Sequence, residues 1–341
     1  MQVPIHIIDI REEVEGVKTF TLEPAARIAY KAGQFLTLIF NHHGKEERRS
    51  FSISSSPSLH EPLRVTVKRV VNGAYSRYLT DKAKTGDTFL STGAAGLFTL
   101  PDDIVKYDEL FLFAAGIGIT PLYSIIKEAL HTTPHLKLVL VYSNRNKEEA
   151  VFYNELIVFQ QQYPGQLRIE FLFSNSFDLS RARLSKSLVA RLLEEYSTVS
   201  KGQQLFYTCG PYEYMRMVIY GLEEQNINSG QIKKENFDVS IPVLKVEPAD
   251  RSAHKVTIQT GGETHMLVVQ YPQTILRAAQ KQGMQLPYSC DAGRCGTCVA
   301  KCTDGKVWMS VNEVLTDKDI AKGLVLTCTG YPLDGDVLLE I

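Results

Sequence analysis

The N-terminal part of the chain alternates between apolar and polar side chains in short runs. Residues 17–22 and 63–68 both repeat with a period of two, which is the pattern of a strand with one buried face. Turn-forming residues separate such runs; they are Gly33, Gly44, Asn72, Gly73, Gly86, Asp87 and Gly93. The pattern predicts an all-β segment over residues 1–103, and a small antiparallel barrel would close its sheet.

After that segment the pattern changes to strands that alternate with helices. Three short apolar runs fit buried strands, at residues 110–114, 136–141 and 167–173. Residues 121–130 fit a helix with Pro121 at its first position. Strands joined by crossover helices predict an α/β domain with a parallel sheet over residues 104–238.

The C-terminal part forms a third unit after a stretch without periodicity. Residues 239–252 contain two prolines and no repeat of apolar positions, so we predict a linker there. Two alternating runs around Gly261 and Gly262 predict a hairpin in the following domain, residues 253–341. Residues 274–282 of that domain predict a helix that ends at a glycine.

Composition and charge narrow the class of protein. The chain has 341 residues, of which 44% are hydrophobic and 22% are charged, as in a globular protein of two or three domains. Its 37 basic and 38 acidic residues leave a formal charge of −1. This balance gives no reason to expect nucleic acid or an anionic membrane as a partner.

The N-terminus lacks the features of a signal peptide, and the longest apolar run, residues 110–126, is interrupted by glycines and a proline. We therefore expect a cytoplasmic protein that does not span a membrane. In that compartment its six cysteines would serve as thiols or metal ligands.

Four of the cysteines have the spacing of a plant-type [2Fe–2S] site. Cys290, Cys295 and Cys298 form a C-x4-C-x2-C pattern, and Cys328 follows after 29 intervening residues. Glycines inside the loop allow a tight backbone path and leave amides free to bond the sulfurs. A zinc site is the alternative, but zinc favours paired C-x2-C units and the chain has one. The spacing therefore predicts an iron–sulfur cluster held by these four thiolates.

Residues 253–341 resemble a plant-type ferredoxin, with residues 287–298 as its cluster loop. The resemblance implies an α+β fold of the β-grasp type around a [2Fe–2S] cluster. The segment has 8 basic and 9 acidic residues, whereas free plant ferredoxins are strongly acidic. A tethered ferredoxin does not need electrostatic steering to reach its reductase, so the near-neutral charge is consistent with this interpretation.

Two short motifs in the N-terminal segment could hold a flavin. Residues 49–52 are Arg49, Ser50, Phe51 and Ser52, and residues 73–76 are Gly73, Ala74, Tyr75 and Ser76. An arginine and a Gly-x-x-Ser turn can hold a diphosphate, and a neighbouring aromatic side chain can stack on a flat ring. Taken alone, Phe51 could equally be a core residue and Gly73 a hairpin turn.

The two motifs resemble the R-x-Y-S and G-x-x-S motifs of the ferredoxin–NADP reductase family, with Phe51 in place of the usual tyrosine. The resemblance implies a β-barrel domain that binds FAD. It implies that Arg49 binds the pyrophosphate, Phe51 stacks on the isoalloxazine ring and Ser52 lies near N5 of the flavin. Residues 73–76 would then wrap the phosphates.

A glycine turn in the second segment suits a nicotinamide nucleotide. Gly116, Gly118, Thr120 and Pro121 lie where the first strand joins the first helix, and a helix N-terminus attracts pyrophosphate. The turn departs from the G-x-G-x-x-G fingerprint, because Pro121 stands at the third glycine position. Arg145 follows the next strand, where an acidic ribose ligand is usual, and an arginine suits a 2′-phosphate better. A packing turn and a surface arginine are the alternative.

The reductase family has G-x-G-x-T-P at this turn and a later Cys-Gly-Pro motif, matched here by Cys209, Gly210 and Pro211. The resemblance implies that Thr120 and Cys209 border the contact of nicotinamide with flavin, although Cys209 could also be a plain buried thiol. Three residues are assigned to the 2′-phosphate: Arg145, Ser174 and Arg183. We therefore expect NADPH to be favoured, although an asparagine follows the serine where NADPH-dependent relatives often have arginine.

Glu235 and Phe237 end the second segment as a Glu-x-aromatic motif, which resembles the terminal motif of the same family. The resemblance places the carboxylate near the nicotinamide and the ring near the flavin. A solvated glutamate and a core phenylalanine are the alternative. With Ser52, Thr120 and Cys209, Glu235 completes the expected set of catalytic residues.

In the order flavin domain, nucleotide domain and ferredoxin, the whole chain resembles the reductase components of multicomponent bacterial oxygenases. The resemblance implies an oxidoreductase in which NAD(P)H reduces FAD, and FAD passes electrons to the [2Fe–2S] cluster and on to an oxygenase component. A reductase for another acceptor, such as a Rieske dioxygenase, a desaturase or a cytochrome, is one alternative. A redox-sensing binding protein is another.

Overall fold

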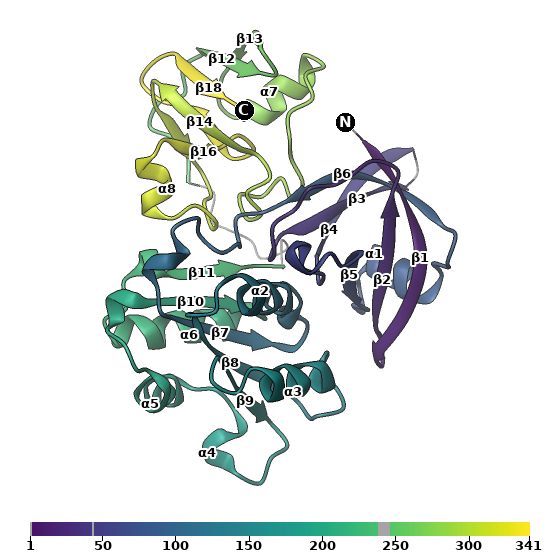
Figure 1. Ribbon diagram of the computed structural model, residues 1–341. Helices are drawn as coiled ribbons and strands as arrows, with labels where there is room; N and C mark the ends of the chain where they lie inside the picture. The colour runs from purple at the N-terminus through teal and green to yellow at the C-terminus, as the bar shows by residue number, and fades with distance from the viewer. Residues whose placement is uncertain (1, 43, 238–245) are drawn as a thin grey trace. The chain divides into compact units, whose positions relative to one another are not determined.

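The computed structural model describes residues 2–42, 44–237 and 246–341. The chain divides into two compact units, one up to Phe237 and one from Asp238 onward (Figure 1). The first unit holds the two N-terminal domains, and the second unit holds the C-terminal domain.

Six antiparallel strands build the first domain: β1 (Val3–Val14), β2 (Val17–Pro24), β3 (Phe35–His42), β4 (Lys45–Ser52), β5 (Leu63–Lys68) and β6 (Thr88–Ala95). They pair in the order β4-β3-β6-β1-β2-β5. A bridge between Ile53 and Val65 joins the two outer strands, so the sheet closes into the expected barrel. Its interior is apolar, with Ile5, Ile53 and Leu36 completely buried.

One helix interrupts the segment that was expected to be all-β. Helix α1 (Ala74–Asp81) begins directly after Gly73, so the prediction of strands and turns alone is wrong here, and so is the hairpin-turn alternative for Gly73. Tyr75, Leu79 and Ala83 recur every four positions and pack against the barrel core. This helical spacing of apolar side chains explains why the stretch is a helix.

Five parallel strands build the second domain: β7 (Glu109–Ala115), β8 (Lys137–Asn144), β9 (Leu167–Phe173), β10 (Gln204–Cys209) and β11 (Ile232–Glu235). Their order is β11-β10-β7-β8-β9, as a parallel sheet with crossovers predicts. The chain runs outward from β7 on one side and then returns to its other side. Such a reversal of strand order marks the carboxyl edge near β7 as the usual place for a ligand.

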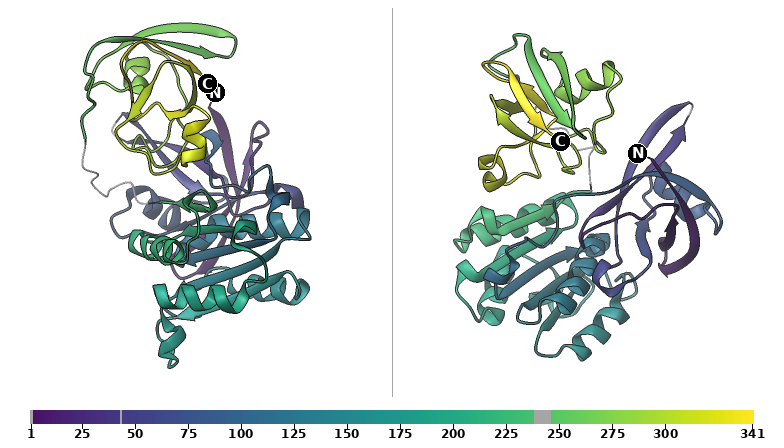
Figure 2. Two further views of the ribbon diagram at one scale, coloured as in Figure 1. Left: turned by 90° about the vertical axis from the view of Figure 1, so that its left-hand side faces the viewer. Right: turned by 45° about the horizontal axis from the view of Figure 1, so that its top comes forward.

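Helices cover both faces of this sheet (Figure 1 and Figure 2): α2 (Ile119–Thr132), α3 (Tyr153–Gln162), α4 (Leu179–Ala182), α5 (Lys186–Tyr196) and α6 (Tyr212–Glu224). Helices α2 and α3 share one apolar core, and α5 and α6 share the other. The first core also contains Val17, Ala32 and Phe98 of the barrel domain. The two domains are therefore packed into one unit.

Helix α2 begins earlier than the sequence predicts. A 3₁₀ turn at Gly116–Gly118 leads directly into it, so Pro121 is the third residue of the helix and not the first. The position remains suitable for proline, because the N–H groups of a first helical turn have no partner within the helix. Among the helices that the structure describes, none has the length and apolar character needed to cross a bilayer.

The C-terminal unit is an α+β domain built on one mixed sheet, with strands β12 (His254–Thr260), β13 (Glu263–Val269), β14 (Val299–Asp304), β16 (Leu324–Leu326) and β18 (Val337–Glu340). The order is β13-β12-β18-β14-β16, and only β12 and β18 run parallel. The hairpin predicted at Gly261 and Gly262 is present. The remaining elements are β15 (Val307–Met309), β17 (Gly330–Pro332), α7 (Ile275–Lys281) and α8 (Asp317–Ala321).

The predicted linker, residues 239–252, is described only in part, because residues 239–245 lie outside the described residues. The described part has no helix or strand and is attached to the C-terminal unit. A carboxylate oxygen of Asp250 accepts a hydrogen bond from the backbone N–H of Asp334 at 3.0 Å and lies 2.6 Å from Nε2 of His254. The domain boundaries at the linker stay a prediction.

Candidate functional site

Strand β4 presents the arginine of the first expected flavin motif at the barrel surface. The guanidinium of Arg49 is half exposed, pairs with a carboxylate oxygen of Glu47 at 2.7 Å and lies 4.7 Å above the ring of Tyr75. Tyr75 belongs to the second expected motif, so the fold brings the two motifs into contact. Phe51 is half-buried and packs against the barrel core. Ser50 lies on the other face of the strand, with its Oγ 3.0 Å from Oγ1 of Thr37.

Residues 73–76 form the first turn of α1. The hydroxyl of Ser76 accepts a hydrogen bond from the backbone N–H of Val70 at 3.2 Å and donates one to the carbonyl of Gly73 at 3.1 Å. A Cβ atom at Gly73 would lie 2.3 Å from this hydroxyl, so the turn requires glycine. An exposed arginine beside a helix N-terminus is a suitable environment for a diphosphate.

The glycine turn after β7 and the Cys-Gly-Pro motif after β10 pack directly against each other. A Cβ atom at Gly118 would lie 2.2 Å from the carbonyl oxygen of Cys209, and one at Gly210 would lie 2.9 Å from Cβ of Ala115. Gly116 has φ +53°, a conformation that favours glycine. Both motifs therefore lie at the carboxyl edge of the sheet beside β7, where the strand order reverses.

Thr120 and Pro121 belong to the first turn of α2 and are buried there. The hydroxyl of Thr120 donates a hydrogen bond to the backbone carbonyl of Ile117 at 2.9 Å, which stabilises the turn. The N-terminus of α2 therefore lies directly after the glycines, in the orientation that suits a pyrophosphate.

Three of the four expected catalytic residues come together from distant parts of the sequence. Strands β10 and β11 pair in parallel with Cys209 opposite Glu235. The hydroxyl of Ser52, at the end of β4, donates a hydrogen bond to a carboxylate oxygen of Glu235 at 3.2 Å. The barrel and the nucleotide domain thus both contribute to this point. The hydroxyl of the fourth residue, Thr120, is engaged by the carbonyl of Ile117.

Desolvation sets the protonation of this group. Burial raises the pKa of Glu235 to about 8, and the hydrogen bond from Ser52 opposes the shift. Burial also raises the pKa of Cys209 well above its usual value, with the charge of Glu235 adding to the effect. At neutral pH the site therefore holds a neutral carboxyl group and a neutral thiol. Phe237, two residues further on, is 44% exposed.

Two of the residues expected at the 2′-phosphate, Arg145 and Ser174, follow the neighbouring strands β8 and β9, and the third, Arg183, follows helix α4. The backbone N–H of Ser174 donates to the carbonyl of Asn144 at 3.0 Å, and that of Asn175 donates to the carbonyl of Arg145 at 3.1 Å. The side chains of Arg145 and Arg183 are exposed, and neither pairs with an acidic side chain of the described residues. The structure therefore places Arg145 and Ser174 side by side at this edge.

Sequence reasoning missed three hydroxyl groups at the same edge. The side-chain oxygens of Ser143, Thr208 and Tyr214 are buried. Ser143 is the polar neighbour of the Tyr214 hydroxyl, and the hydroxyl of Thr208 makes no hydrogen bond to another described residue. Ser143 and Thr208 stand near the carboxyl ends of β8 and β10, and Tyr214 lies in the first turn of α6. Buried hydroxyls usually have a partner, so a polar ligand such as a nucleotide fits here. The signal in the sequence was a hydroxyl residue at the end of an otherwise apolar strand.

The four expected cluster ligands gather within the C-terminal unit as two pairs. Cys298 and Cys328 have their sulfur atoms 3.2 Å apart. A hydrogen bond from the Cys295 thiol is the largest of the effects that lower the pKa of Cys290 to about 6. No three His, Cys, Asp or Glu side chains in the described ranges converge as ligands of a single ion. Two pairs of thiols suit a cluster of two irons, each of which takes two thiolates.

The loop that carries three of these cysteines is held by tight packing and by an ion pair. Gly293 has φ +72°, and a Cβ atom there would lie 2.5 Å from the carbonyl oxygen of Val311. The side chain of Arg294 is 2% exposed, and its Nε lies 3.1 Å from a carboxylate oxygen of Glu313. The backbone N–H of Glu313 donates in turn to the carbonyl of Gly293 at 3.0 Å. Sequence reasoning missed this arginine and its partner.

Three known domain families match consecutive parts of the chain. The oxidoreductase FAD-binding domain matches residues 6–100, and the oxidoreductase NAD-binding domain matches residues 112–219. The 2Fe-2S iron-sulfur cluster binding domain matches residues 258–333, which include all four cysteines.

Known proteins are similar to the chain over nearly its whole length. The ferredoxin reductase component of 3-ketosteroid-9-alpha-monooxygenase from Rhodococcus rhodochrous is 32% identical over 323 residues, which are 92% of this chain and 88% of that protein. One of the subunits of 1,2-phenylacetyl-CoA epoxidase from Escherichia coli is 30% identical over 329 residues, 94% of this chain and 92% of that one. The solved structure of phthalate dioxygenase reductase has the same fold, with a TM-score of 0.60 and 22% identity, over 100% of this chain and 98% of that chain.

Each of the three domains thus matches a family that binds one of the three cofactors. The protein belongs to the ferredoxin–NADP reductase-like flavoproteins with a C-terminal [2Fe–2S] domain, and it passes electrons from NAD(P)H through FAD to the iron–sulfur cluster.

Proposed function

We propose that this protein is the cytoplasmic reductase component of an oxygenase and that it takes its electrons from NADPH in preference to NADH. The observation that carries the electron path is the meeting of Ser52, Cys209 and Glu235. Ser52 is the last residue of the first flavin motif, and Cys209 and Glu235 end strands of the nucleotide domain. A flavin and a nicotinamide that both reach this group would be in contact.

On this proposal Arg49 and the N-terminus of α1 hold the diphosphate of FAD. The support is the exposed guanidinium of Arg49 against Tyr75, which joins the two motifs at one place. Phe51 would contact the isoalloxazine ring from β4. When bound, FAD accepts both electrons of NAD(P)H and releases them singly. The task of the chain is to position the ring and to exclude water.

The glycine turn and α2 would receive the pyrophosphate of the nucleotide. Gly116 and Gly118 leave room for it, and Gly210 allows the Cys-Gly-Pro motif to pack closely. Arg145, Ser174 and Arg183 would surround a 2′-phosphate, which is the basis for the preference for NADPH. Arg181, in the same segment, cannot serve in this role because it pairs with Glu170 and Glu195.

Ser52 and Glu235 would control protonation at the contact of the two rings. Because the pKa of Glu235 is raised to about 8, its carboxyl group is neutral at pH 7. A neutral group does not oppose the negative charge that arrives with the hydride. Thr120 would position the nicotinamide from the first turn of α2, and Phe237 would border the flavin.

The thiolates of Cys290, Cys295, Cys298 and Cys328 would hold the cluster. Their grouping as two pairs supports this assignment over a single zinc ion. None of the six cysteines is engaged in a disulfide, so the four expected ligands are available to a cluster. The near-neutral charge of the chain gives no support for a nucleic acid partner.

The electron acceptor is proposed to be an oxygenase component, with phenylacetyl-CoA epoxidase as the first candidate. The support is the similarity along the whole chain to the Escherichia coli protein of that enzyme system. The relative named for 3-ketosteroid-9-alpha-monooxygenase is similarly close, so a different oxygenase is the second candidate. A desaturase, a cytochrome or a redox-sensing role has no observation in its favour here.

An anaerobic absorbance titration with NADPH and NADH in parallel tests the proposal. We expect the flavin and cluster bands to bleach with either nucleotide, and faster with NADPH. Equal rates with the two nucleotides would contradict the role of Arg145 and Arg183. Slow turnover of the fully loaded protein with cytochrome c would favour a sensor over a reductase.

A further inference from the structure

Helix α2 makes polar contacts with the segment that follows β4. We call β4 the flavin strand, because it carries the first expected flavin motif, and we call these contacts the seam. The seam consists of Ser124, Lys127 and Glu128 on the helix and residues 54–61 of the barrel domain. Ser124 donates a hydrogen bond to the carbonyl of Ser55 at 2.6 Å. The hydroxyl of Ser56 donates to a carboxylate oxygen of Glu128 at 2.7 Å. The three helix residues lie within one turn, so they present one face to the barrel.

At the centre of the seam is a buried ion pair. Nζ of Lys127 pairs with Glu61, and the two side chains are 3% and 21% exposed. Glu61 also accepts a hydrogen bond from the backbone N–H of Ser56 at 2.7 Å. Burial lowers the pKa of Lys127, and the carboxylate of Glu61 opposes this shift. A buried pair of this kind contributes little to stability compared with apolar side chains of the same size, so stability does not explain its presence.

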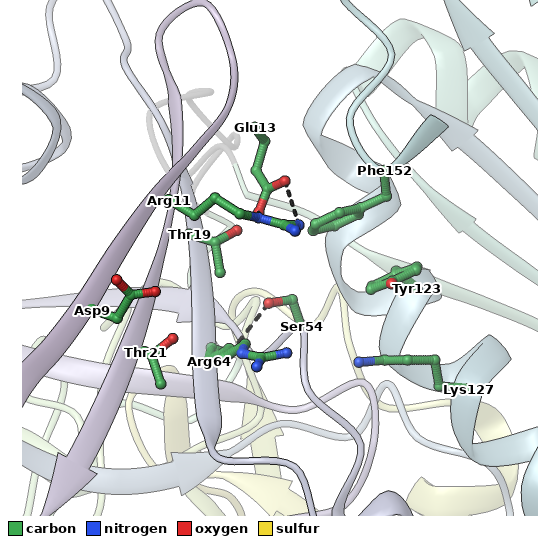
Figure 3. Close-up of a pocket in the computed structure, with 10 residues that line it drawn as sticks. All are labelled: Asp9, Arg11, Glu13, Thr19, Thr21, Ser54, Arg64, Tyr123, Lys127 and Phe152. Carbon is green, nitrogen blue, oxygen red and sulfur yellow. Dashed lines mark hydrogen bonds and ion pairs between the residues drawn. The ribbon is translucent and has the colours of Figure 1, made fainter. Parts of the chain in front are cut away.

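Polar contacts beside the ion pair add to the apolar packing that joins the helix to the barrel, in which Ile125 lies against Gly33. A cavity of about 110 Å³ lies there, and Figure 3 shows Lys127 reaching across from α2 toward Arg64 and Ser54 of the barrel. The cavity does not suit an anion, because its cations already have carboxylate partners. Arg11 pairs with Glu13 at 2.6 Å, and Arg64 lies 3.8 Å from Glu61. The apolar packing is not directional, so the hydrogen bonds and the ion pair of the seam select one orientation of the helix.

Both sides of the seam continue directly into the cofactor motifs. Residues 54–61 follow Ser52, which ends the flavin strand, and α2 begins at Ile119 after the glycine turn of the nucleotide motif. Lys127 lies eight residues from that helix start, which corresponds to about 12 Å along the axis. A small rotation of α2 about the seam would therefore move the nucleotide end of the helix relative to the flavin strand.

We propose that Lys127 and Glu61, with Ser124 and Glu128, are positioning residues that hold the nucleotide-binding helix at the orientation required for hydride transfer to FAD. The proposal rests on the electron path from NAD(P)H to FAD. The four positioning residues lie outside both cofactor motifs. The hydride carries both electrons from the nucleotide, which is oxidised, to the flavin, which is reduced. An error of about 1 Å in such a geometry can cost up to about 100-fold in rate.

Stopped-flow reduction of the holoprotein by NADPH tests the proposal with the variants Lys127→Met, Glu61→Gln and the double variant. Lys127→Met keeps the unbranched shape of the side chain up to the position of the ammonium group, and Glu61 still accepts the hydrogen bond from the backbone N–H of Ser56. We expect the rate constant at saturating NADPH to fall about 10-fold or more in each single variant. The NADPH concentration that gives half of this rate constant should change little. The long-wavelength absorbance of the nucleotide–flavin contact should weaken as well. The double variant should be no slower than the singles, because both remove one interaction.

Lys186→Met is the matched control. It removes an exposed lysine of the same domain that pairs with Glu224, and it should leave the rate constant unchanged. Flavin content and thermal stability are measured for every variant. Unchanged rate constants per bound flavin, or additive losses in the double variant, would overturn the positioning role. A wild-type flavin that NADPH fails to reduce would instead contradict the electron path itself.

Discussion

At the scale of single residues, the half-buried carboxyl group of Glu235 is the most informative feature of the contact between the two domains. Its pKa is raised to about 8 by burial, and its hydrogen bond with Ser52 links it to the flavin strand. Its neighbour Cys209 is completely buried and neutral. The place where hydride is proposed to pass is therefore uncharged at pH 7 and becomes negative only in alkaline solution.

This titration predicts a pH dependence of flavin reduction. In the wild type the rate constant should fall as the pH rises through about 8, because an ionised Glu235 opposes the arriving negative charge. In Glu235→Gln the rate constant should stay level over the same range. Stopped-flow reduction between about pH 6 and 9.5 measures both profiles. An inflection that persists in the variant would assign it to another group.

The raised pKa of Glu235 also predicts how the stability of the fold depends on pH. In the unfolded chain Glu235 ionises near its ordinary pKa of 4.5, so between 4.5 and about 8 the folded state binds more protons. Folding stability attributable to this group is therefore lost as the pH rises through that window. Glu235→Gln should raise Tm relative to the wild type more at pH 8.5 than at pH 4.5. The opposite order would mean that the carboxyl group is not desolvated.

The exposed side chains of Arg145 and Arg183 predict that the protein prefers NADPH to NADH. Arg145→Gln and Arg183→Gln should each raise KM for NADPH roughly 10-fold or more, because a hydrogen bond to a charged group is worth about 1.5–3 kcal/mol. KM for NADH should not change, since NADH lacks the 2′-phosphate. Steady-state reduction of cytochrome c with both nucleotides measures the ratio.

Arg181→Gln is the control for that prediction. Arg181 lies in the same segment, but Glu170 and Glu195 already hold its guanidinium. Its replacement should lower stability and leave the NADPH-to-NADH ratio unchanged. A change of ratio in this variant alone would assign the phosphate to Arg181 and exclude the pair proposed here.

At the scale of elements, helix α1 makes a prediction about FAD affinity. Gly73→Ala would displace the hydroxyl of Ser76, which lies 2.3 Å from the position of the new Cβ. Loss of one hydrogen bond costs about 1 kcal/mol, so FAD should bind the apoprotein about 5-fold more weakly. Fluorescence titration with FAD measures the affinity. Gly202→Ala, where a Cβ would meet nothing within 4 Å, should bind FAD as the wild type does.

The elements that sequence reasoning predicts well are those with a clear apolar period. Strands β2 and β5 of the barrel, the buried strands β7 and β8, and helix α7 between Thr274 and Gly283 are predicted in this way. Helix α1 is missed because it is only eight residues long and begins at a glycine that also suits a turn. The start of α2 is misplaced because a 3₁₀ turn precedes it.

The spacing of residues in the sequence cannot predict the contacts of the site that join distant elements. Ser52 and Glu235 are 183 positions apart, and only the packing of the barrel on the nucleotide domain joins them. The pair of Arg294 with Glu313 is similar, since neither residue belongs to a motif. The cysteine spacing is different, because the chemistry of the cluster itself limits the number and order of its ligands.

At the scale of the whole molecule, the division into two compact units predicts that the two redox steps can be separated. Cys328→Ser should abolish the visible bands of the cluster and the transfer of electrons to a protein acceptor. Reduction of the flavin by NADPH should continue, because its residues all lie in the first unit. Anaerobic spectra of the variant with NADPH measure both effects.

Cys302→Ser provides the comparison within the same domain. Cys302 is half-buried on β14, and its thiol points to the carbonyl of Asp304 at 3.3 Å and not to the four expected ligands. The variant should keep its cluster and its electron transfer. Loss of the cluster from Cys302→Ser, with retention in Cys328→Ser, would require a different ligand set.

The contact of Gly118 with the carbonyl of Cys209 limits how the sequence can change during evolution. Because no side chain fits between them, a substitution at Gly118 cannot be accepted until β10 has moved, and a moved β10 would take Cys209 away from Glu235. The glycine turn after β7 and strand β10 are therefore constrained to change together. Adaptation of such a reductase to a new oxygenase should accordingly accumulate on surfaces remote from this contact, while the junction itself is inherited unchanged.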